Sequence, residues 1–471
     1  MWVRVIAGGA AALLLLPVLA LFYSISWFLG QSVRFAAFVS VAAVLLVSLL
    51  VHDPIYDIPV VAAATLCFLT FSSRVLGVHF AAVVGFLAYA VARRHYGFGP
   101  SAILDALVVV CGIAVVWTFI CAHSLWIPAS PAALTHVEEA IYHHALRTHN
   151  PSNDNERTTP AYHMRVVAGI GTVHVPYTGQ TTSKKRPLNV VLVHGFAGGN
   201  ALWAASLFGL AEHFNIYAVE WLGCGRSDRP ATNFQTWDEA DAFYVQGLEQ
   251  WRHAMQLDSF VLCGHSMGAM FATHYALRYP TRVEQLVLIS PCGIPLPESE
   301  PHWLMNALWA LEWTPMDLVR NAGPLGPRLM HLILAARLSR QPSTNAIKRG
   351  VLDLSMMVEY NYHNWAGKRS GEVGMYTHLL PVRRAYAKRP LKDMLVPTRL
   401  TMPISFIYGQ DGVDWMNAAH AVKVMQGLTQ HTALHKIPSA GHQVFMDNPE
   451  VFTTCLRDSI HQAAAATPIF D

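Results

Sequence analysis

Apolar positions divide the chain into two unlike parts. From Val5 to Ile127 nearly every window is apolar, in five runs separated by a few charged residues: 5–30, 35–51, 58–71, 75–92 and 103–122. A helix needs about 20 apolar residues to cross a bilayer, and backbone in lipid must satisfy its hydrogen bonds within its own segment. The pattern therefore predicts four or five transmembrane helices within 1–127, the short run at 58–71 being a candidate re-entrant segment.

This apolar part predicts a membrane anchor. A cleaved signal peptide behind Arg4 would explain the first run, but not the four that follow it. No row of charges lines a pathway through the runs, which favours anchoring over transport. We expect a multi-pass membrane protein, in contact with membrane lipids through its N-terminal helices. The seven cysteines lack the spacing of a disulfide framework or a zinc site, so the rest of the chain should face the cytosol from an intracellular membrane.

The remainder of the chain alternates short β-rich runs with helix-length stretches. We expect a connecting helix and polar linker over 128–164 and a folded domain over 165–471. After a strand pair that starts near 166, buried strands are expected at 189–195, 215–221, 260–266, 283–290 and 404–409. Continuous Val, Ile and Leu runs are typical of a mostly parallel sheet with helices on both faces. Between about 296 and 390, Trp- and Met-rich helices replace this pattern, which predicts a cap over the ligand-binding edge of the sheet.

The pentapeptide GHSMG at residues 264–268 joins an apolar strand to an amphipathic helix. Such a strand–turn–helix with Gly-x-Ser-x-Gly predicts a nucleophile elbow, with Ser266 as the nucleophile. The turn is so tight that a Cβ at Gly264 or Gly268 would clash. The first backbone N–H of the helix, at Met267, would then point at an oxyanion.

A nucleophilic serine needs an acid and then a base later in the chain. His442 follows Gly441 in a loop after the final strand, which suits the base. Both Asp411 and Asp414 follow the preceding strand, and either could orient the imidazole. Upstream, HGFAGG at 194–199 ends a strand in small residues, so the Phe196 N–H is expected to complete the oxyanion hole. His194 is expected to be structural.

These elements resemble those of α/β-hydrolases. A finer resemblance is to the subfamily of the N-acyl phospholipase B, the adipose lipase coactivator, and the plant and yeast lysophosphatidic acid acyltransferases. It rests on WLGCGRSDRP (221–230), SPCGIP (290–295), AYAKRPL (385–391), DWM (414–416) and the H-x-x-x-x-D pattern from His442 to Asp447. The resemblance covers roughly 185–458. It implies the α/β-hydrolase fold with a helical cap and favours Asp414 as the acid, with Asp411 still an alternative.

The resemblance also bears on activity. The coactivator branch carries Asn at the nucleophile position, whereas this chain has Ser266, so a catalytic role is favoured. Asp447 precedes Asn448 and Pro449 and is expected to cap the last helix. We expect a membrane-anchored serine hydrolase that cleaves acyl esters of lipids, as a lysophospholipase or phospholipase does. An alternative is a lysophosphatidic acid or lysophospholipid acyltransferase that uses the same residues.

Two further readings remain open. A proline-iminopeptidase-like serine peptidase would need an acidic cluster, which Glu298 and Glu300 could supply. A non-catalytic regulator of a lipase would keep its function without Ser266. The net charge of +3, without a basic run, argues against nucleic acid. Expected partners are a lipid acyl ester and membrane lipids, with a lipase or lipid-droplet protein as a further candidate partner. No metal or cofactor is expected.

Overall fold

The computed structural model describes residues 129–149, 162–179, 186–295, 314–380 and 386–466, together with the single residues 306, 309 and 312. The five apolar runs at 5–122 lie outside these residues. Within the described ranges, no helix combines the length and apolar character that a bilayer crossing requires. This finding corrects the expectation of a multi-pass membrane protein.

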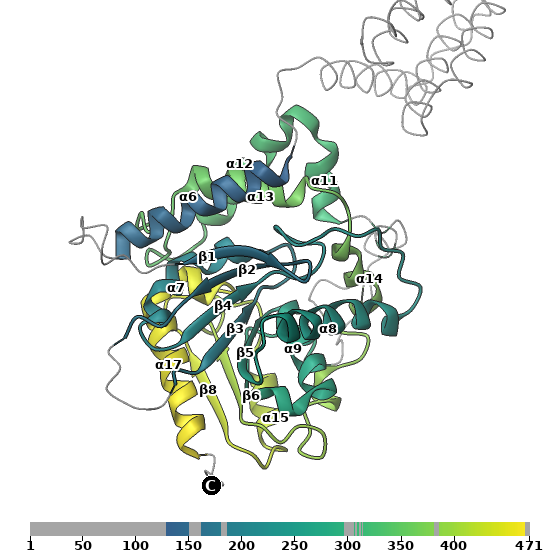
Figure 1. Cartoon of the computed structure of the whole chain (residues 1–471), viewed down its shortest axis with the longest axis vertical. Coiled ribbons are helices and arrows are strands. Elements are labelled where there is room, and N and C mark those ends of the chain that lie inside the picture. The colour runs from purple at the N-terminus through teal and green to yellow at the C-terminus, as the bar shows by residue number, and fades with distance from the viewer. Residues whose placement is uncertain are drawn as a thin grey trace, which may run out of the picture. The chain divides into compact units, whose positions relative to one another are not determined.

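The centre of the fold is an eight-stranded sheet in the order β1-β2-β4-β3-β5-β6-β7-β8 (Figure 1). β1 pairs antiparallel with β2 and β2 antiparallel with β4, and every later pairing is parallel. The strands are β1 His163–Val167, β2 Ile170–Val175, β3 Asn189–Val193, β4 Asn215–Val219, β5 Phe260–His265, β6 Val283–Ile289, β7 Ile404–Tyr408 and β8 Thr432–Lys436. The expected mostly parallel sheet is confirmed.

Side chains at alternating strand positions pack into two apolar layers, one on each face of the sheet. In β3, Val191 and Val193 pack into the layer beneath α8 (Trp237–Ala254) and α9 (Met267–Arg278). Val190 and Leu192 face the opposite layer, with α7 (Ala204–Ala211), α16 (Val444–Asp447) and α17 (Pro449–Ala466). Successive side chains of a strand point to opposite faces, so strands covered on both sides are apolar throughout.

The remaining helices lie before the sheet and between its strands. α6 (Pro131–His149) precedes β1. The described residues between β6 and β7 include the helices α11 (Pro315–Asn321), α12 (Gly326–Leu338), α13 (Leu354–Trp365) and α14 (Gly374–His378). α15 (Ala419–Met425) lies between β7 and β8. Short 3-10 turns are η1 Asn200–Trp203, η2 Pro280–Arg282, η3 Gly323–Leu325, η4 Gly371–Val373 and η5 Leu391–Asp393. α6 and α13 lie side by side at the top of Figure 1.

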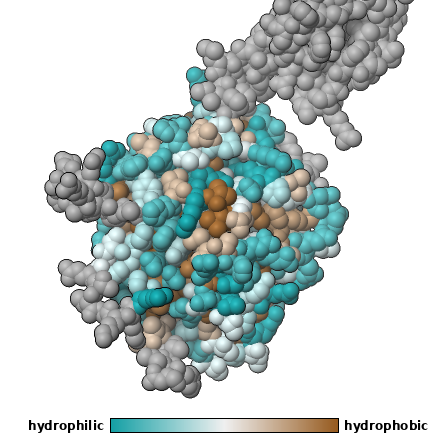
Figure 2. Space-filling view, in the orientation of Figure 1, coloured by the Kyte–Doolittle hydropathy of each residue, from teal (hydrophilic) through white to brown (hydrophobic). Residues whose placement is uncertain are grey.

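α6 is joined to the body by buried charges. The Arg226 Nε donates to Glu138 at 2.6 Å, and the two side chains are 5% and 0% exposed. The Tyr142 hydroxyl donates to the other oxygen of Glu138 at 2.8 Å, and Arg226 also donates to the Thr172 carbonyl. A buried carboxylate is tolerated only when it is paired and hydrogen-bonded in this way. Away from such contacts, the face in Figure 2 is mostly hydrophilic, with an apolar patch near its centre.

Candidate active site

Ser266 occupies a strained turn between β5 and α9. Its φ and ψ are 55° and −119°, in a region that non-glycine residues seldom adopt. The Ser266 N–H donates to the Ile289 carbonyl at the end of the neighbouring strand, and its carbonyl accepts from the Ala269 N–H. These contacts hold the turn in place, so the hydroxyl stands at the carboxyl end of the parallel strands.

Glycines make this turn possible. A Cβ on Gly264 would lie 2.6 Å from the Ala269 Cα, and a Cβ on Gly268 would lie 2.3 Å from the His194 carbonyl oxygen. Both obstacles are backbone atoms, which cannot turn aside as a flexible side chain can. The steric clash expected from the sequence would therefore be with these two backbone atoms.

His442 and Asp414 converge on Ser266 from the other end of the domain. The His442 Nε2 lies 3.0 Å from the Ser266 Oγ, and its Nδ1 lies 3.3 Å from the Asp414 Oδ1. With Nδ1 protonated, that nitrogen donates to Asp414 and Nε2 accepts from the serine hydroxyl. His442 thus contacts both Ser266 and Asp414, the two side chains with which it is expected to act.

Asp414 is held as a carboxylate by four donors. Besides His442, it accepts from the Ser290 hydroxyl at 2.6 Å and from the N–H groups of Gly409 and Met416. Burial opposes its ionisation, but the hydrogen bonds from His442, Ser290 and Met416, with the favourable charge of His442, lower the pKa of Asp414 overall. Its side chain is 1% exposed.

Asp411, the alternative acid, lies elsewhere. Its carboxylate forms an exposed ion pair with Lys436 of β8. The geometry therefore favours Asp414 over Asp411.

The loop that carries His442 is fixed from two sides. The His265 Nε2 lies 2.9 Å from the His442 carbonyl oxygen and donates to it. Asp447 accepts from the Gly441 N–H at 2.9 Å and from the Asn345 side-chain amide at 2.8 Å. Within the described ranges Asp447 has no hydrogen bond to the first turn of α17, so it does not cap that helix as expected. Its hydrogen bonds instead hold the loop that carries His442.

Burial sets the protonation state of the His442 ring. Loss of hydration lowers its pKa below the ordinary value, against the hydrogen bond and charge of Asp414, which raise it. The imidazole is therefore neutral near pH 7, as a general base must be.

The two expected oxyanion donors lie beside Ser266. Met267 begins α9, so its N–H has no partner within the helix. Among the described residues, neither the Met267 N–H nor the Phe196 N–H donates to a protein acceptor. His194 lies behind this loop: its Nδ1 donates to the Gly195 carbonyl and its Nε2 accepts from the Trp221 N–H. These contacts suit the structural role expected of His194.

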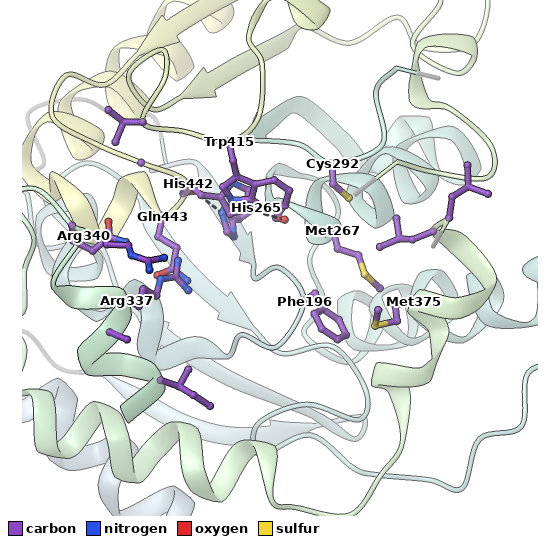
Figure 3. Close-up of a pocket in the computed structure, with 18 of the residues that line it drawn as sticks. Phe196, His265, Met267, Cys292, Arg337, Arg340, Met375, Trp415, His442 and Gln443 are labelled. Atoms are coloured by element: carbon purple, nitrogen blue, oxygen red, sulfur yellow. Dashed lines mark hydrogen bonds between the residues drawn. The ribbon is translucent and has the colours of Figure 1, made fainter. Parts of the chain in front are cut away.

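Ser266 and His442 line a pocket of about 730 Å³. One wall is apolar and includes Phe196, Met267, Met375, Leu379, Leu380 and Trp415. Arg337, Arg340, Gln341 and Gln443 line another part. In Figure 3 the labelled arginines and Gln443 stand on one side of His442, with Phe196, Met267 and Met375 on the other.

Several residues of this site were missed in the sequence. Ser290 belongs to the SPCGIP motif, but its contact with Asp414 spans 124 positions. Arg337 lies in the last turn of α12, and Arg340 lies two residues beyond the end of that helix at Leu338. Glu298 and Glu300 lie outside the described residues.

Comparison with known proteins agrees with this geometry. Residues 189–449, more than half of the chain, match the family described as the alpha/beta hydrolase fold. A probable 1-acylglycerol-3-phosphate O-acyltransferase of Oryza sativa is 32% identical over 57% of this chain and 66% of its own length. The match therefore spans just under two thirds of this plant relative.

Two human proteins are similar over more of their length. The 1-acylglycerol-3-phosphate O-acyltransferase ABHD5 is 32% identical over 59% of this chain and 78% of its own. The (lyso)-N-acylphosphatidylethanolamine lipase is 31% identical over 57% of this chain and 78% of its own. The chain therefore belongs to the α/β-hydrolase family, within the subfamily that includes these acyltransferases and this lipase.

Proposed function

We propose that this chain is a lipid acyl hydrolase or acyltransferase that works through an acyl-enzyme on Ser266. The observation that carries the proposal is the continuous contact from Ser266 through His442 to Asp414 beside a pocket of about 730 Å³. A hydroxyl becomes a nucleophile when an adjacent base accepts its proton and a third group orients that base.

The first half-reaction transfers the acyl group to the protein. The His442 Nε2 takes the Ser266 proton as Oγ bonds to the ester carbonyl carbon, and the carbonyl electron pair moves onto oxygen. The N–H groups of Met267 and Phe196 donate to this oxyanion. His442 then protonates the leaving alkoxide as its C–O bond breaks, which leaves an acyl-Ser266 ester.

The second half-reaction repeats these steps with an acceptor. His442 deprotonates the acceptor O–H, its oxygen attacks the acyl carbon, and the Ser266 Oγ leaves and regains a proton. Water yields a free fatty acid, whereas the hydroxyl of a lysophospholipid yields a new ester. Relatives named as an acyltransferase and as a lipase support both outcomes for this site.

The pocket lining favours an amphiphilic, anionic substrate. The apolar wall around Met267 and Met375 suits an acyl chain, and soft methionine side chains adapt to chains of different length. Arg337 and Arg340 offer cationic donors for a phosphate group. An acyl ester of a glycerophosphate carries both features.

The charge of the pocket lining argues against a peptidase. Among the described residues that line the pocket there is no carboxylate, and the charged side chains are Arg337 and Arg340. A free substrate amine would meet positive charge there.

A fluorophosphonate probe tests the proposal directly. We expect the wild-type chain and Ser259→Ala, a control just before β5, to be labelled, and Ser266→Ala to remain unlabelled. Mass spectrometry of products from an acyl donor and a lysophospholipid then identifies water or lipid as the acceptor. Labelling or turnover that persists in Ser266→Ala would overturn Ser266 as the nucleophile. A wild-type chain that is neither labelled nor active would leave the non-catalytic regulator in place of the enzyme.

A further inference from the structure

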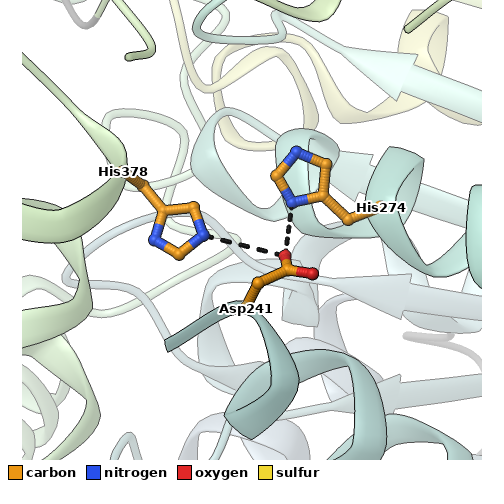
Figure 4. Close-up of side chains that lie close together, drawn as sticks. All are labelled: Asp241, His274 and His378. Atoms are coloured by element: carbon orange, nitrogen blue, oxygen red, sulfur yellow. Dashed lines mark hydrogen bonds and ion pairs between the residues drawn. The ribbon is translucent and has the colours of Figure 1, made fainter. Parts of the chain in front are cut away.

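Three titratable side chains meet outside the pocket, on three different helices. Asp241 lies on α8, His274 on α9, and His378 is the last residue of α14. The His274 Nδ1 is 2.6 Å and the His378 Nε2 3.7 Å from the same oxygen, Oδ1 of Asp241. Figure 4 shows the two imidazoles flanking this carboxylate. One ligand atom from each residue lies within 4.8 Å of the other two.

The hydrogen bonds of His378 fix which of its nitrogens carries a proton. Its Nδ1 lies 3.0 Å from the Gly374 carbonyl and 2.9 Å from the Thr377 hydroxyl oxygen. The Thr377 hydroxyl already donates its proton to the same Gly374 carbonyl, so both neighbours of Nδ1 act as acceptors. Nδ1 must therefore be the protonated nitrogen, and in the neutral ring Nε2 presents a lone pair.

That lone pair faces the Asp241 carboxylate. The His378 side chain is fully buried, and within the described part of the chain its Nε2 has no hydrogen-bond partner. Two electron-rich atoms that face each other in a largely buried place repel unless a proton or a metal ion lies between them. Their separation of 3.7 Å is longer than a hydrogen bond and leaves room for a metal ion. A ring N–H bound to a backbone carbonyl with the other nitrogen free is also how histidines are prepared for metal ligation.

We propose that Asp241, His274 and His378 bind a Zn²⁺ ion. Two imidazoles and one carboxylate form a donor set that zinc accepts, with water as a fourth ligand. With zinc–ligand bonds of about 2.0–2.1 Å, tetrahedral ligand atoms stand roughly 3.3 Å apart. The two separations from Asp241, 2.6 Å to His274 and 3.7 Å to His378, bracket that value. All three ligand atoms lie within 4.8 Å of one another, so the histidines need to approach each other by at most about 1.5 Å to complete the site.

The position of the site suggests what the ion does. The Asp241 side chain is 20% exposed, which gives an ion and a water access, whereas both histidines are buried. α9 begins directly after Ser266. Met375 on α14 and Leu379, the residue directly after α14, line the pocket. The ion therefore ties one wall of the pocket to the helix that follows the nucleophile.

Zinc binding by the untagged full-length chain tests this assignment. The protein is stripped with a chelator, dialysed against Zn²⁺, and assayed for bound metal and thermal unfolding. We expect one tight equivalent per chain and a rise in Tm on adding Zn²⁺, because a ligand that binds only the folded state stabilises it. Asp241→Asn and His378→Gln should each lose this equivalent, with affinity at least about 100-fold lower, since even losing an outer-shell partner costs 10–100-fold.

A matched control separates this site from the other histidines of the chain. His253→Gln removes an exposed histidine from α8, the same helix as Asp241, and should bind zinc as the wild type does. Equal binding by all four proteins would overturn the proposal. So would a stripped wild-type chain that takes up no tight equivalent, a result that does not depend on how the variants fold. Neither readout involves Ser266, so the result is independent of the proposed chemistry.

Discussion

At the scale of single residues, Ser290 contacts Asp414, the acid of the proposed mechanism. Its hydroxyl donates to Asp414 at 2.6 Å and helps to keep the carboxylate ionised. A hydrogen bond to a charged group contributes about 1.5–3 kcal/mol, and each 1.4 kcal/mol corresponds to a factor of ten in rate. We therefore expect Ser290→Ala to lower kcat/KM for an acyl ester by at least about 10-fold, measured by ester hydrolysis.

The control for Ser290 is another buried hydroxyl. Thr273 on α9 donates to the Ala269 carbonyl and does not contact Asp414, so Thr273→Ala should retain activity. If both variants lost activity equally, a general packing defect would account for the loss, and the assignment of Ser290 would fail.

The pH profile reports on His442. Only the neutral imidazole accepts the serine proton, so kcat/KM should fall as pH drops through the pKa of His442. Burial lowers that pKa, so the acidic inflection should lie below 6.5. The carboxylate of Asp414 favours the charged ring, so Asp414→Asn should move the inflection lower still and reduce kcat by about 10⁴-fold. An inflection above 6.5 in the wild type would contradict this account.

Residue-scale prediction from the sequence depended on local signals. Ser266 and His442 were selected from short contexts, a strand–turn–helix and a loop after the last strand, and the structure places their side chains 3.0 Å apart. Asp411 and Asp414 share one loop, so only the fold distinguishes the exposed ion pair of the first from the buried contacts of the second. His378 and Asp241 are 137 positions apart, and no sequence pattern indicates that they meet.

At the scale of elements, the junction of β5 and α9 leaves no room for an added side chain. In Gly268→Ala the new Cβ would lie 2.3 Å from the His194 carbonyl oxygen, so the turn must move. We expect activity to fall at least about 100-fold, since a displacement of about 1 Å at the chemistry has that effect, and unfolding free energy to fall by about 1–3 kcal/mol. In Gly427→Ala the nearest atom is 3.5 Å away, so neither quantity should change.

The docking of α6 depends on the pair Glu138–Arg226. Arg226→Met would leave the buried carboxylate without its cation, and breaking a buried pair costs about 3–5 kcal/mol. Urea unfolding should show this loss for the single variant. The double variant Arg226→Met/Glu138→Gln should recover a large part of it, because the uncompensated charge is gone. A double variant as unstable as the single would show that packing, rather than charge, holds α6.

Strands were easier to predict from the sequence when both of their faces are buried. β3, β5, β6 and β7 are enclosed on both faces and read as continuous apolar runs, so their positions were found to within two residues. β8 is an edge strand with partly buried positions throughout most of its length, and TALHK carries little apolar pattern. Its existence was implied only by the position expected for His442.

At the scale of the whole molecule, the pocket joins two regions that are distant in sequence. Ser266, His442 and Asp414 lie at the carboxyl edge of the sheet. Arg337 lies on α12 and Arg340 two residues beyond its end at Leu338, between β6 and β7. In the proposed mechanism, catalysis and head-group binding therefore fall on separate elements, so we expect that one can be changed without the other.

This separation predicts a change in specificity rather than a loss of catalysis. Arg337→Gln/Arg340→Gln should raise KM for an acyl glycerophosphate by at least about 10-fold, because a hydrogen bond to a charged group contributes about 1.5–3 kcal/mol. KM and kcat for a neutral monoacylglycerol should stay unchanged. Arg328 is an exposed arginine of α12 that does not line the pocket. Arg328→Gln should therefore leave KM and kcat for both substrates unchanged. An equal loss with the neutral substrate would mean that the arginines maintain the shape of the pocket and do not bind phosphate.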